Sequence, residues 1–203
     1  MHLSPDYSRT DKNVILTPEK IMEATHPIIT YPENTFGDLA MTKLPSDRLK
    51  WCRRNHYAIM APPPKPMCLI EIWKLWPHHF YLSIGERFAT EEFANKEKIP
   101  LGWSAIKTTP VSDSFCLRLS HQCKRLSRHE RIPNVTELSW LTVVYHLVYR
   151  IRLFENVYVR TSSRAADGRS ICFGYNDTEG ISLVPYDDNS FSASLGLAAA
   201  LKL

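Results

Sequence analysis

The sequence predicts an α+β fold, in which one apolar helix lies at the centre of a domain that ends in short strands. Residues 135–149 form a strongly apolar stretch that follows a helix-start signal, and no helical periodicity follows Phe154. Short apolar runs separated by turn pairs such as Asp167-Gly168 and Glu179-Gly180 follow instead, which is typical of a strand meander. The 203 residues suffice for one core and a small appendage.

Composition places the chain among ordinary folded proteins. Hydrophobic residues make up 44% and charged residues 23%, which excludes collagen-like, mucin-like and coiled-coil proteins. No stretch approaches the roughly 20 apolar residues that span a bilayer, so we expect no membrane span. Residues 1–7 lack a basic stretch followed by an apolar core, and the five cysteines include no Cys-x-x-Cys pair. We therefore expect no secretory signal, no disulfide framework and a cytoplasmic location.

Residues 1–66 are predicted to form an N-terminal scaffold of helical and extended segments. Thr17, followed by Pro18 and Glu19, predicts a short helix over residues 18–24. Ser46-Asp47 begins a second helix, whose apolar positions are Leu49, Trp51 and Cys52. The prolines within residues 62–66 then favour extended polyproline geometry ahead of the main domain, residues 67–203.

The first part of that domain is predicted to alternate strands and short helices. Residues 67–73 and 80–84 are rich in β-branched and aromatic types and predict strands, as do residues 101–107. Thr90-Glu91-Glu92 marks a short helix. Spacings of four, four and three then predict a helix with a basic opposite face, and the residues that set them are Phe115, Leu119, Cys123 and Leu126.

The central helix is predicted over residues 135–149. Pro133 ends the preceding segment, and Asn134 with Glu137 three residues later resembles a capping box. Apolar residues occupy more than one side of the helix, with Leu138 and Leu141 on one side and Trp140 on another. We therefore expect this helix to be the buried centre of the domain.

The C-terminal part of the chain has an unusual composition. Residues 165–201 contain no Lys, Gln, Met or Trp and a single Glu, although these five types make up about a fifth of the rest of the chain. At that rate about seven would be expected in the stretch. Tyr, Asn, Asp, Ser and Phe are concentrated there instead, as they are in adaptable binding surfaces. A turn-rich β segment with no binding role would favour several of the same types.

Three segments carry a family resemblance. They are Pro133–Leu141, Val157–Ser163 and the closing Leu195–Ala199. Together the span from Ile132 onward resembles the C-type-lectin-like fold of the formylglycine-generating-enzyme type. More narrowly, it resembles the variable proteins of diversity-generating retroelements, which use this fold to display randomised residues near the C-terminus. In that family, mutagenesis of the adenines in Asn-type template codons cannot produce Lys, Gln, Glu, Met or Trp, the five types that are depleted here.

The resemblance implies a display region over residues 156–194 that presents a diversified surface to a protein or glycan ligand. It also implies a location that is cytoplasmic or virion-associated. Strand alternation puts Ser182 and Val184 outward, with Ile181 and Leu183 inward, and separates Ser170, Cys172 and Gly174 from the inward Ile171 and Phe173. The candidate ligand-binding residues are Tyr158, Ser162, Ser170, Cys172, Tyr175, Asn176, Asp177, Ser182, Val184, Tyr186, Asp187, Asp188, Asn189, Phe191 and Ser192.

The sequence contains few features that indicate catalysis or metal binding. No nucleophile elbow, P-loop or dinucleotide fingerprint occurs, and the C-terminal part lacks the close cysteine pair that thiol chemistry needs. His78-His79 are adjacent and point in different directions, and Asp187-Asp188-Asn189 do not complete a calcium ligand set. We predict no enzymatic activity, no metal and no cofactor, and we assign Trp51, Trp73, Trp76 and Trp103 to packing.

Two alternatives remain open. Of the 25 basic residues, 23 lie within residues 1–164, and they include a run over residues 124–131. A solvated helix face is the simpler explanation, but a nucleic-acid-associated or enzymatic accessory protein would also carry such a run. A structural subunit of a phage or surface assembly is compatible with the display hypothesis. The sequence does not indicate the oligomeric state.

Overall fold

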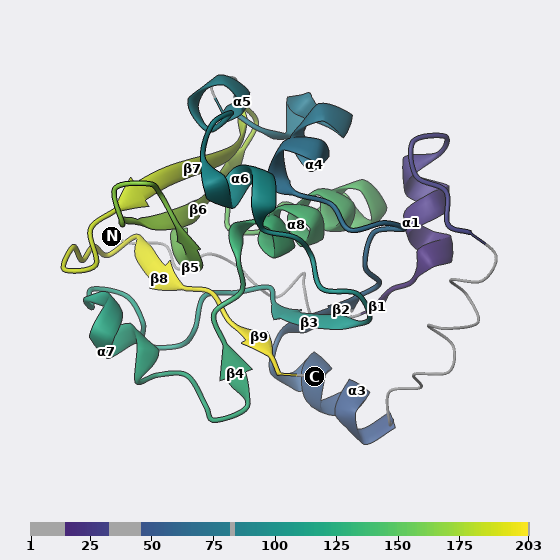
Figure 1. Cartoon of the computed structure of the whole chain (residues 1–203). Helices are drawn as coiled ribbons and strands as arrows, with labels where there is room; N and C mark the ends of the chain where they lie inside the picture. Colours follow the sequence, from purple (N-terminus) through teal and green to yellow (C-terminus); the bar gives the residue numbers. More distant parts are fainter. Residues whose placement is uncertain (1–14, 33–45, 82–83, 203) are drawn as a thin grey trace.

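The computed structural model describes residues 15–32, 46–81 and 84–202, and shows an α+β fold with two mixed sheets (Figure 1). The first sheet has the strand order β1-β2-β3-β9-β4 and the second has the order β7-β6-β5-β8. The strands are β1 (Ile15–Leu16), β2 (Tyr57–Met60), β3 (Ser104–Lys107), β4 (Glu130–Arg131), β5 (Tyr158–Arg164), β6 (Ser170–Asp177), β7 (Gly180–Tyr186), β8 (Leu195–Leu197) and β9 (Ala200–Leu201). The helices are α1 (Pro18–Thr25), α3 (Ser46–Arg54), α4 (Leu69–Leu75), the 3-10 turn η2 (Pro77–His79), α5 (Ile84–Arg87), α6 (Glu92–Lys96), α7 (Leu119–Cys123) and α8 (Val135–Tyr149).

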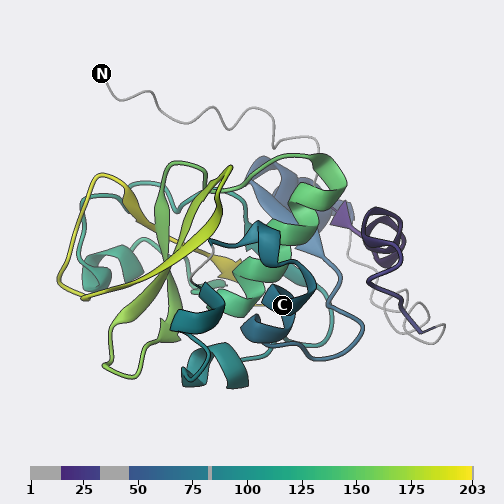
Figure 2. The same ribbon diagram turned by 90° about the horizontal axis from the view of Figure 1, so that it is seen from above.

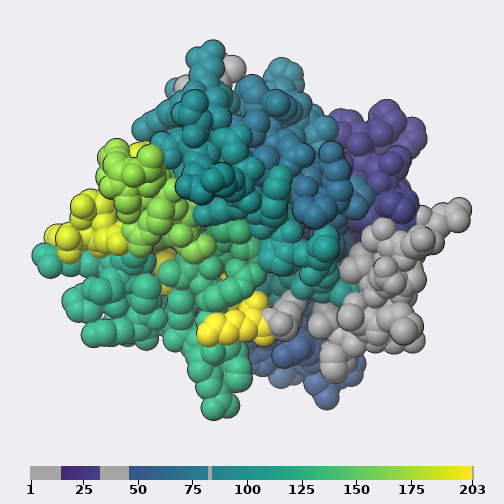
Figure 3. Space-filling model, viewed as in Figure 1, coloured from purple at the N-terminus to yellow at the C-terminus, as the bar shows by residue number. Residues whose placement is uncertain are grey.

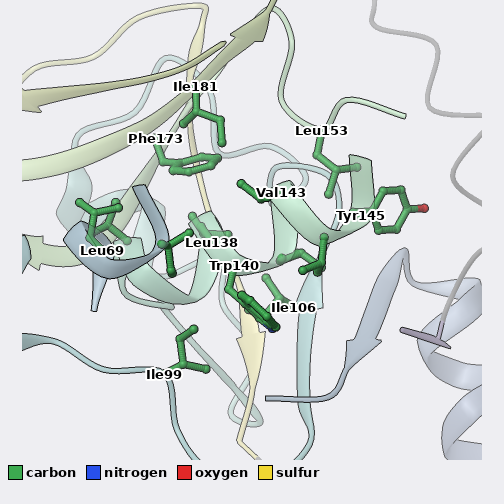
Figure 4. Close-up of a cluster of buried hydrophobic side chains, with 14 of the residues drawn as sticks. Leu69, Ile99, Ile106, Leu138, Trp140, Val143, Tyr145, Leu153, Phe173 and Ile181 are labelled. Carbon is green, nitrogen blue, oxygen red and sulfur yellow. The ribbon is translucent and has the colours of Figure 1, made fainter. Parts of the chain in front are cut away.

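Helix α8 lies between the two sheets, as the view from above shows (Figure 2). Its bounds agree with the prediction, and its residues from Val135 to Tyr145 are all buried. In Figure 4, Leu138, Trp140 and Val143 of α8 lie between Phe173 and Ile181 on one side and Ile106 of β3 on the other. The prediction of a buried central helix is therefore confirmed.

The capping box at the start of α8 also anchors the five-stranded sheet. The Asn134 side chain accepts a hydrogen bond from the Glu137 N–H, and the Glu137 carboxylate accepts one from the Asn134 N–H at 2.9 Å. The same carboxylate accepts two hydrogen bonds from Arg131 of β4, at 2.5 and 2.9 Å. Because its side chain is only 2% exposed, Glu137 is a buried charge whose partners hold it in place.

The predicted helices near residues 18–24, 46 and 90–92 are confirmed as α1, α3 and α6, and β3 confirms the second half of the strand predicted over 101–107. The strand predicted over 67–73 is wrong, because residues 69–75 form helix α4. For 80–84, residues 82 and 83 lie outside the described part. Phe80 makes an isolated bridge to Ile181, and Ile84 begins helix α5, so the described residues of this segment do not form the predicted strand.

Helix α7 is shorter than predicted, and its buried residue is a different one. Cys123 is exposed, whereas Gln122 is fully buried. The Gln122 side-chain amide donates to the carbonyl oxygens of Ser114 at 2.8 Å and Leu195 at 3.0 Å, which fastens α7 to the start of β8. Strand β2, which precedes residue 66, pairs with β3, which follows it, so the five-stranded sheet contains strands from both sides of the expected domain boundary.

Candidate functional site

The four-stranded sheet has one face toward α8 and one face away from it. Ile171, Phe173, Ile181 and Leu183 are all buried in the core that contains α8, which confirms their predicted inward direction. The register places Tyr158, Gly174 and Ser182 in one cross-strand row of the outer face. The neighbouring row contains Arg160, Cys172 and Val184.

Three tyrosines gather on this outer face, and we call them the tyrosine cluster: Tyr158, Tyr175 and Tyr186. The Tyr158 ring lies 4.6 Å from that of Tyr175 and 6.1 Å from that of Tyr186, between ring centroids. The Tyr158 hydroxyl is 3.0 Å from the Ser182 hydroxyl, and burial raises the pKa of Tyr158. The cluster therefore presents aromatic surface with adjacent hydroxyl groups.

The backbone beneath the tyrosine cluster requires glycine at position 174. A Cβ atom there would lie 1.9 Å from the Val157 carbonyl oxygen, so no larger residue fits without a shift of the strands. The next residue, Tyr175, has a φ of +44° and is 37% exposed. This left-handed residue lies within the register shift between Gly174 and Asp177, where the strand pairing is irregular.

Residues 187–194, which we call the covering loop, cross this face. The loop connects β7 to β8, and these strands lie at opposite edges of the sheet, so the connection must pass β6 and β5. Beneath it lies Arg160, whose side chain is fully buried. One of its terminal nitrogens donates to the carbonyl oxygens of Asp187 at 3.0 Å and Ser190 at 2.8 Å. Arg160 thus ties the loop backbone to the centre of the sheet.

Asp188 fastens the same loop from its other side. Its carboxylate accepts hydrogen bonds from Arg164 at 2.7 and 2.8 Å and from the Ser170 hydroxyl at 2.6 Å. Burial raises the pKa of Asp188, but these bonds and the charges of Arg164 and Arg160 outweigh it, so that the pKa is lowered overall. A segment outside this sheet also binds the loop, since the amides of Leu119 and Cys116 donate to the carbonyls of Asp188 and Ser192.

Most of the candidate residues are at least partly accessible. Phe191 is 62% exposed, and it lies with Ser192 in the covering loop. The candidates with exposed or half-buried positions are Tyr158, Ser162, Tyr175, Asp177, Ser182, Val184, Tyr186, Asp187, Asp188, Asn189, Phe191 and Ser192. In the space-filling view, the C-terminal strands and the covering loop, in green and yellow, form one end of the molecule (Figure 3).

Ser170, Cys172 and Asn176 are buried, so their predicted display to a ligand is wrong. Ser170 donates to Asp188 beneath the covering loop, and Cys172 stands beside Arg160 in the same cross-strand row. Burial raises the pKa of Cys172 to about 12, which keeps the thiol protonated at neutral pH. Asn176 points inward, and its side-chain amide donates to the Leu153 carbonyl at 3.2 Å.

Arg160 was missed by the sequence analysis. It lies two positions after Tyr158 in a strand, so alternation places the two side chains on the same face. A charged residue flanked by Val159 and Thr161 within a strand was the available signal. The carbonyl groups that Arg160 binds belong to the covering loop, which follows β5 in the chain only after two further strands.

The packing assignment of the tryptophans needs one correction. Trp76 is buried, and Trp73 and Trp103 are half-buried against the core, as predicted. Trp51 is 45% exposed on α3. It packs on Tyr57 alone among the described rings, with the ring centroids 5.5 Å apart.

The structure brings His79 to His146 rather than to a metal cluster. Their Nδ1 atoms lie 3.5 Å apart, and Arg150 and Arg152 are close enough to influence both rings. Within residues 15–32, 46–81 and 84–202, no group of three or more His, Cys, Asp or Glu residues is placed to hold a metal ion. Of the two aspartates considered for calcium, Asp188 accepts from Arg164 and Ser170, and Asp187 accepts from the Asn189 N–H.

The His79–His146 pair predicts a loss of stability in mild acid. Burial, followed by the charges of His146, Arg152, His78 and Arg150, lowers the pKa of His79 to about 4. The unfolded chain binds this proton near pH 6.5 and the folded protein does not, so stability falls from pH 6.5 to about pH 4 and then levels. We expect a loss of about 1–2 kcal/mol after allowance for solvent screening. Urea titrations at several pH values measure it.

The matched variants are His79→Gln and His78→Gln. The first removes the half-buried imidazole and should flatten the pH dependence, while the second removes only one of the smaller contributions to the pKa of His79 and should leave most of the pH dependence in place. Equal pH dependence in both variants would show that the acid loss originates elsewhere.

None of the protein-family models, curated proteins or solved structures compared with the chain matches it. No helix of the described part is long and apolar enough to cross a membrane.

Proposed function

We propose that the chain is a non-enzymatic ligand-binding protein of the receptor or adhesion type. In this proposal a C-type-lectin-like scaffold, resembling the variable proteins of diversity-generating retroelements, displays a diversified surface to a protein or glycan. The observation that carries the proposal is the tyrosine cluster beside the exposed covering loop. Tyr and Phe supply contact area at small entropy cost, and neighbouring Ser, Asn and Asp supply adaptable hydrogen bonds.

The display region separates buried side chains that hold the backbone from exposed side chains, and this separation supports the proposal. Buried residues such as Arg160, Ser170 and Gly174 hold the backbone, while the side chains of Tyr175, Asn189 and Phe191 are exposed. Exposed side chains of this kind can change without disturbing the core. The depletion of five residue types over residues 165–201 is the second support.

The first test is to sequence the 3′ end of the gene and its flanking DNA across many cells of the source population. The proposal expects substitutions at adenine-derived positions within codons 156–194, beside a near-copy of that segment and a reverse-transcriptase gene. An invariant 3′ end without a near-copy would overturn diversification.

Combined replacement of Tyr186 and Phe191 by alanine should abolish ligand binding with little change in stability. Phe191 is 62% exposed and Tyr186 is half-buried, so we expect the free energy of unfolding to fall by no more than about 1 kcal/mol. Thermal denaturation measures this, and surface plasmon resonance on ligands selected from a display library measures binding.

The matched control is Cys172→Tyr, which forces a large side chain into a fully buried position of the same sheet face. It should destabilise by about 1–3 kcal/mol or more. A large stability loss in the Tyr186→Ala/Phe191→Ala protein would place these residues in the core and contradict the proposal.

A further inference from the structure

A pocket of about 240 Å³ lies outside the display region. It is lined by Arg48, Trp51, His129, Leu201 and Lys202. These residues come from α3, from the turn before β4 and from the end of β9, so the fold brings together segments that are distant in the sequence. The pocket combines an aromatic wall with cationic side chains, and the described residues that line it include no acidic one.

Trp51 forms the aromatic wall. Its indole stacks on Tyr57 with an interplanar angle of 30°, and 45% of the residue is exposed. Tyr57 is itself buried and its hydroxyl donates to Glu130. Because Tyr57 supports one face of Trp51, the indole is a rigid platform on which a planar group can stack.

The polar side of the pocket is arranged for an anion. Arg48 and Lys202 supply two positive charges from different elements. Arg128 Nε donates to His129 Nε2 at 2.9 Å, which leaves the other imidazole nitrogen as a donor. The carboxylate of the neighbouring Glu130 is already engaged, since one oxygen accepts from Tyr57 and the other from the Ser127 N–H at 2.6 Å. Phosphate oxygens match the donors of this pocket.

Basic side chains continue from this pocket along one edge of the molecule. Figure 1 shows α7, the turn before β4 and α3 along the lower edge. The exposed cations that flank α7 or lie in the turn before β4 are Arg118, Lys124, Arg125 and Arg128. A phosphate backbone that leaves the pocket therefore has a positively charged path.

We propose that this pocket and edge bind single-stranded nucleic acid, with one base stacked on Trp51 and the flanking phosphates at Arg48 and Lys202. A duplex fits this arrangement less well, because its bases are paired and stacked and cannot reach the indole. A free nucleotide would fill the pocket without using the cations that flank α7. The proposed site is separate from the display region and does not depend on the ligand-binding proposal.

The test is fluorescence anisotropy with a labelled 12-nucleotide single strand at 50 and 200 mM salt. With three or four phosphates neutralised, log K should fall against log salt with a slope of about −2 to −3. A duplex of the same length and a free mononucleotide should each bind at least about 10-fold more weakly. Absence of binding at 50 mM salt, or equal affinity for the mononucleotide, would overturn the proposal.

The variants separate base stacking from general attraction. Trp51→Ala should weaken binding by about 10-fold or more, whereas Trp51→Phe keeps a stacking ring and should retain most of the affinity. Lys202→Glu should reduce the salt slope by about 1 or more. The charge-matched control is Lys96→Glu on α6, which is exposed and lies away from the lower edge in Figure 1, and it should bind as the unmodified protein does.

Each variant is first checked by thermal denaturation, since Trp51 also packs on Tyr57. If Trp51→Ala lowers stability, base stacking is tested instead by the affinity of Trp51→Phe and by quenching of tryptophan fluorescence when the unlabelled strand binds. Unchanged affinity in a folded Trp51→Ala protein, or equal weakening by Lys96→Glu, would show only unspecific attraction of an anion and overturn the stacking site. Stronger binding to anionic vesicles than to the oligonucleotide would also overturn it.

Discussion

Replacement of Glu137 by alanine is expected to lower the free energy of unfolding by about 3–5 kcal/mol. The substitution leaves the half-buried Arg131 guanidinium without its two hydrogen bonds and removes the acceptor of the Asn134 N–H at the start of α8. Both losses occur where α8 meets β4, so the five-stranded sheet and the central helix are affected together. Urea denaturation followed by circular dichroism measures the change.

Two control variants test whether the buried ion pair causes this loss of stability. Glu92→Ala removes an ion pair of similar length, 2.8 Å to Lys96, whose side chains are 75% and 73% exposed, so the free energy of unfolding should stay within measurement error of the unmodified protein. The double variant Arg131→Met/Glu137→Met removes both charges, so it should be less destabilised than the sum of the single variants. If Glu137→Ala is no more harmful than Glu92→Ala, the buried pair does not support the fold as argued.

Replacement of Arg160 by alanine is expected to release the covering loop and to cost about 2–4 kcal/mol. The carbonyls of Asp187 and Ser190 lose their donor, and a cavity opens in the middle of the four-stranded sheet. Since the amides of Cys116 and Leu119 donate to the same loop, their hydrogen exchange should accelerate. Exchange measured by mass spectrometry or NMR tests this directly.

Arg169→Ala is the matched control for this second variant. Arg169 belongs to the β5–β6 turn, is about half exposed and pairs with the neighbouring Asp167 of the same turn. Because solvent screens this pair, its removal should leave both the stability and the exchange at Cys116 and Leu119 unchanged. Arg160→Lys keeps the charge but loses the planar fork and should fall between the two. Unchanged exchange in Arg160→Ala would mean that other contacts hold the loop.

Local signals explain where the sequence predicted the fold well. The start of α8 depends on Asn134 and Glu137, three residues apart, and the strands after Phe154 are separated by short turns. The prediction failed where it relied on residue types and not on the spacing of apolar residues. Residues 67–73 are rich in strand-forming types, yet Leu69, Ile72 and Trp76 are buried at helical spacings of three and four. The Glu71 carboxylate accepts from the Cys68 N–H and completes a cap that a cysteine rarely provides.

For the candidate site, strand alternation predicted which side chains face the core and which face outward, and the sequence predicted little more. Alternation separates Phe173 from Cys172 correctly, but it does not reveal that another segment lies on the outward face. Ser170 is buried where it donates to Asp188 of the covering loop, and Trp51 of α3 lines a pocket with His129 only because the fold brings the turn before β4 to this helix. Such contacts follow from tertiary packing, which no short window of sequence contains.

The path of residues 195–201 has a consequence for the order of folding. Strand β8 pairs with β5 of one sheet, and β9, directly after it, joins β3 and β4 of the other. The pair Ile106–Ala200 alone closes a loop that contains α8 and the whole four-stranded sheet. Neither sheet can therefore be completed while this segment is still being synthesised, and the sides of α8 that face the two sheets are fully covered only afterwards. Slow folding and a need for protection from aggregation during synthesis follow from this connection.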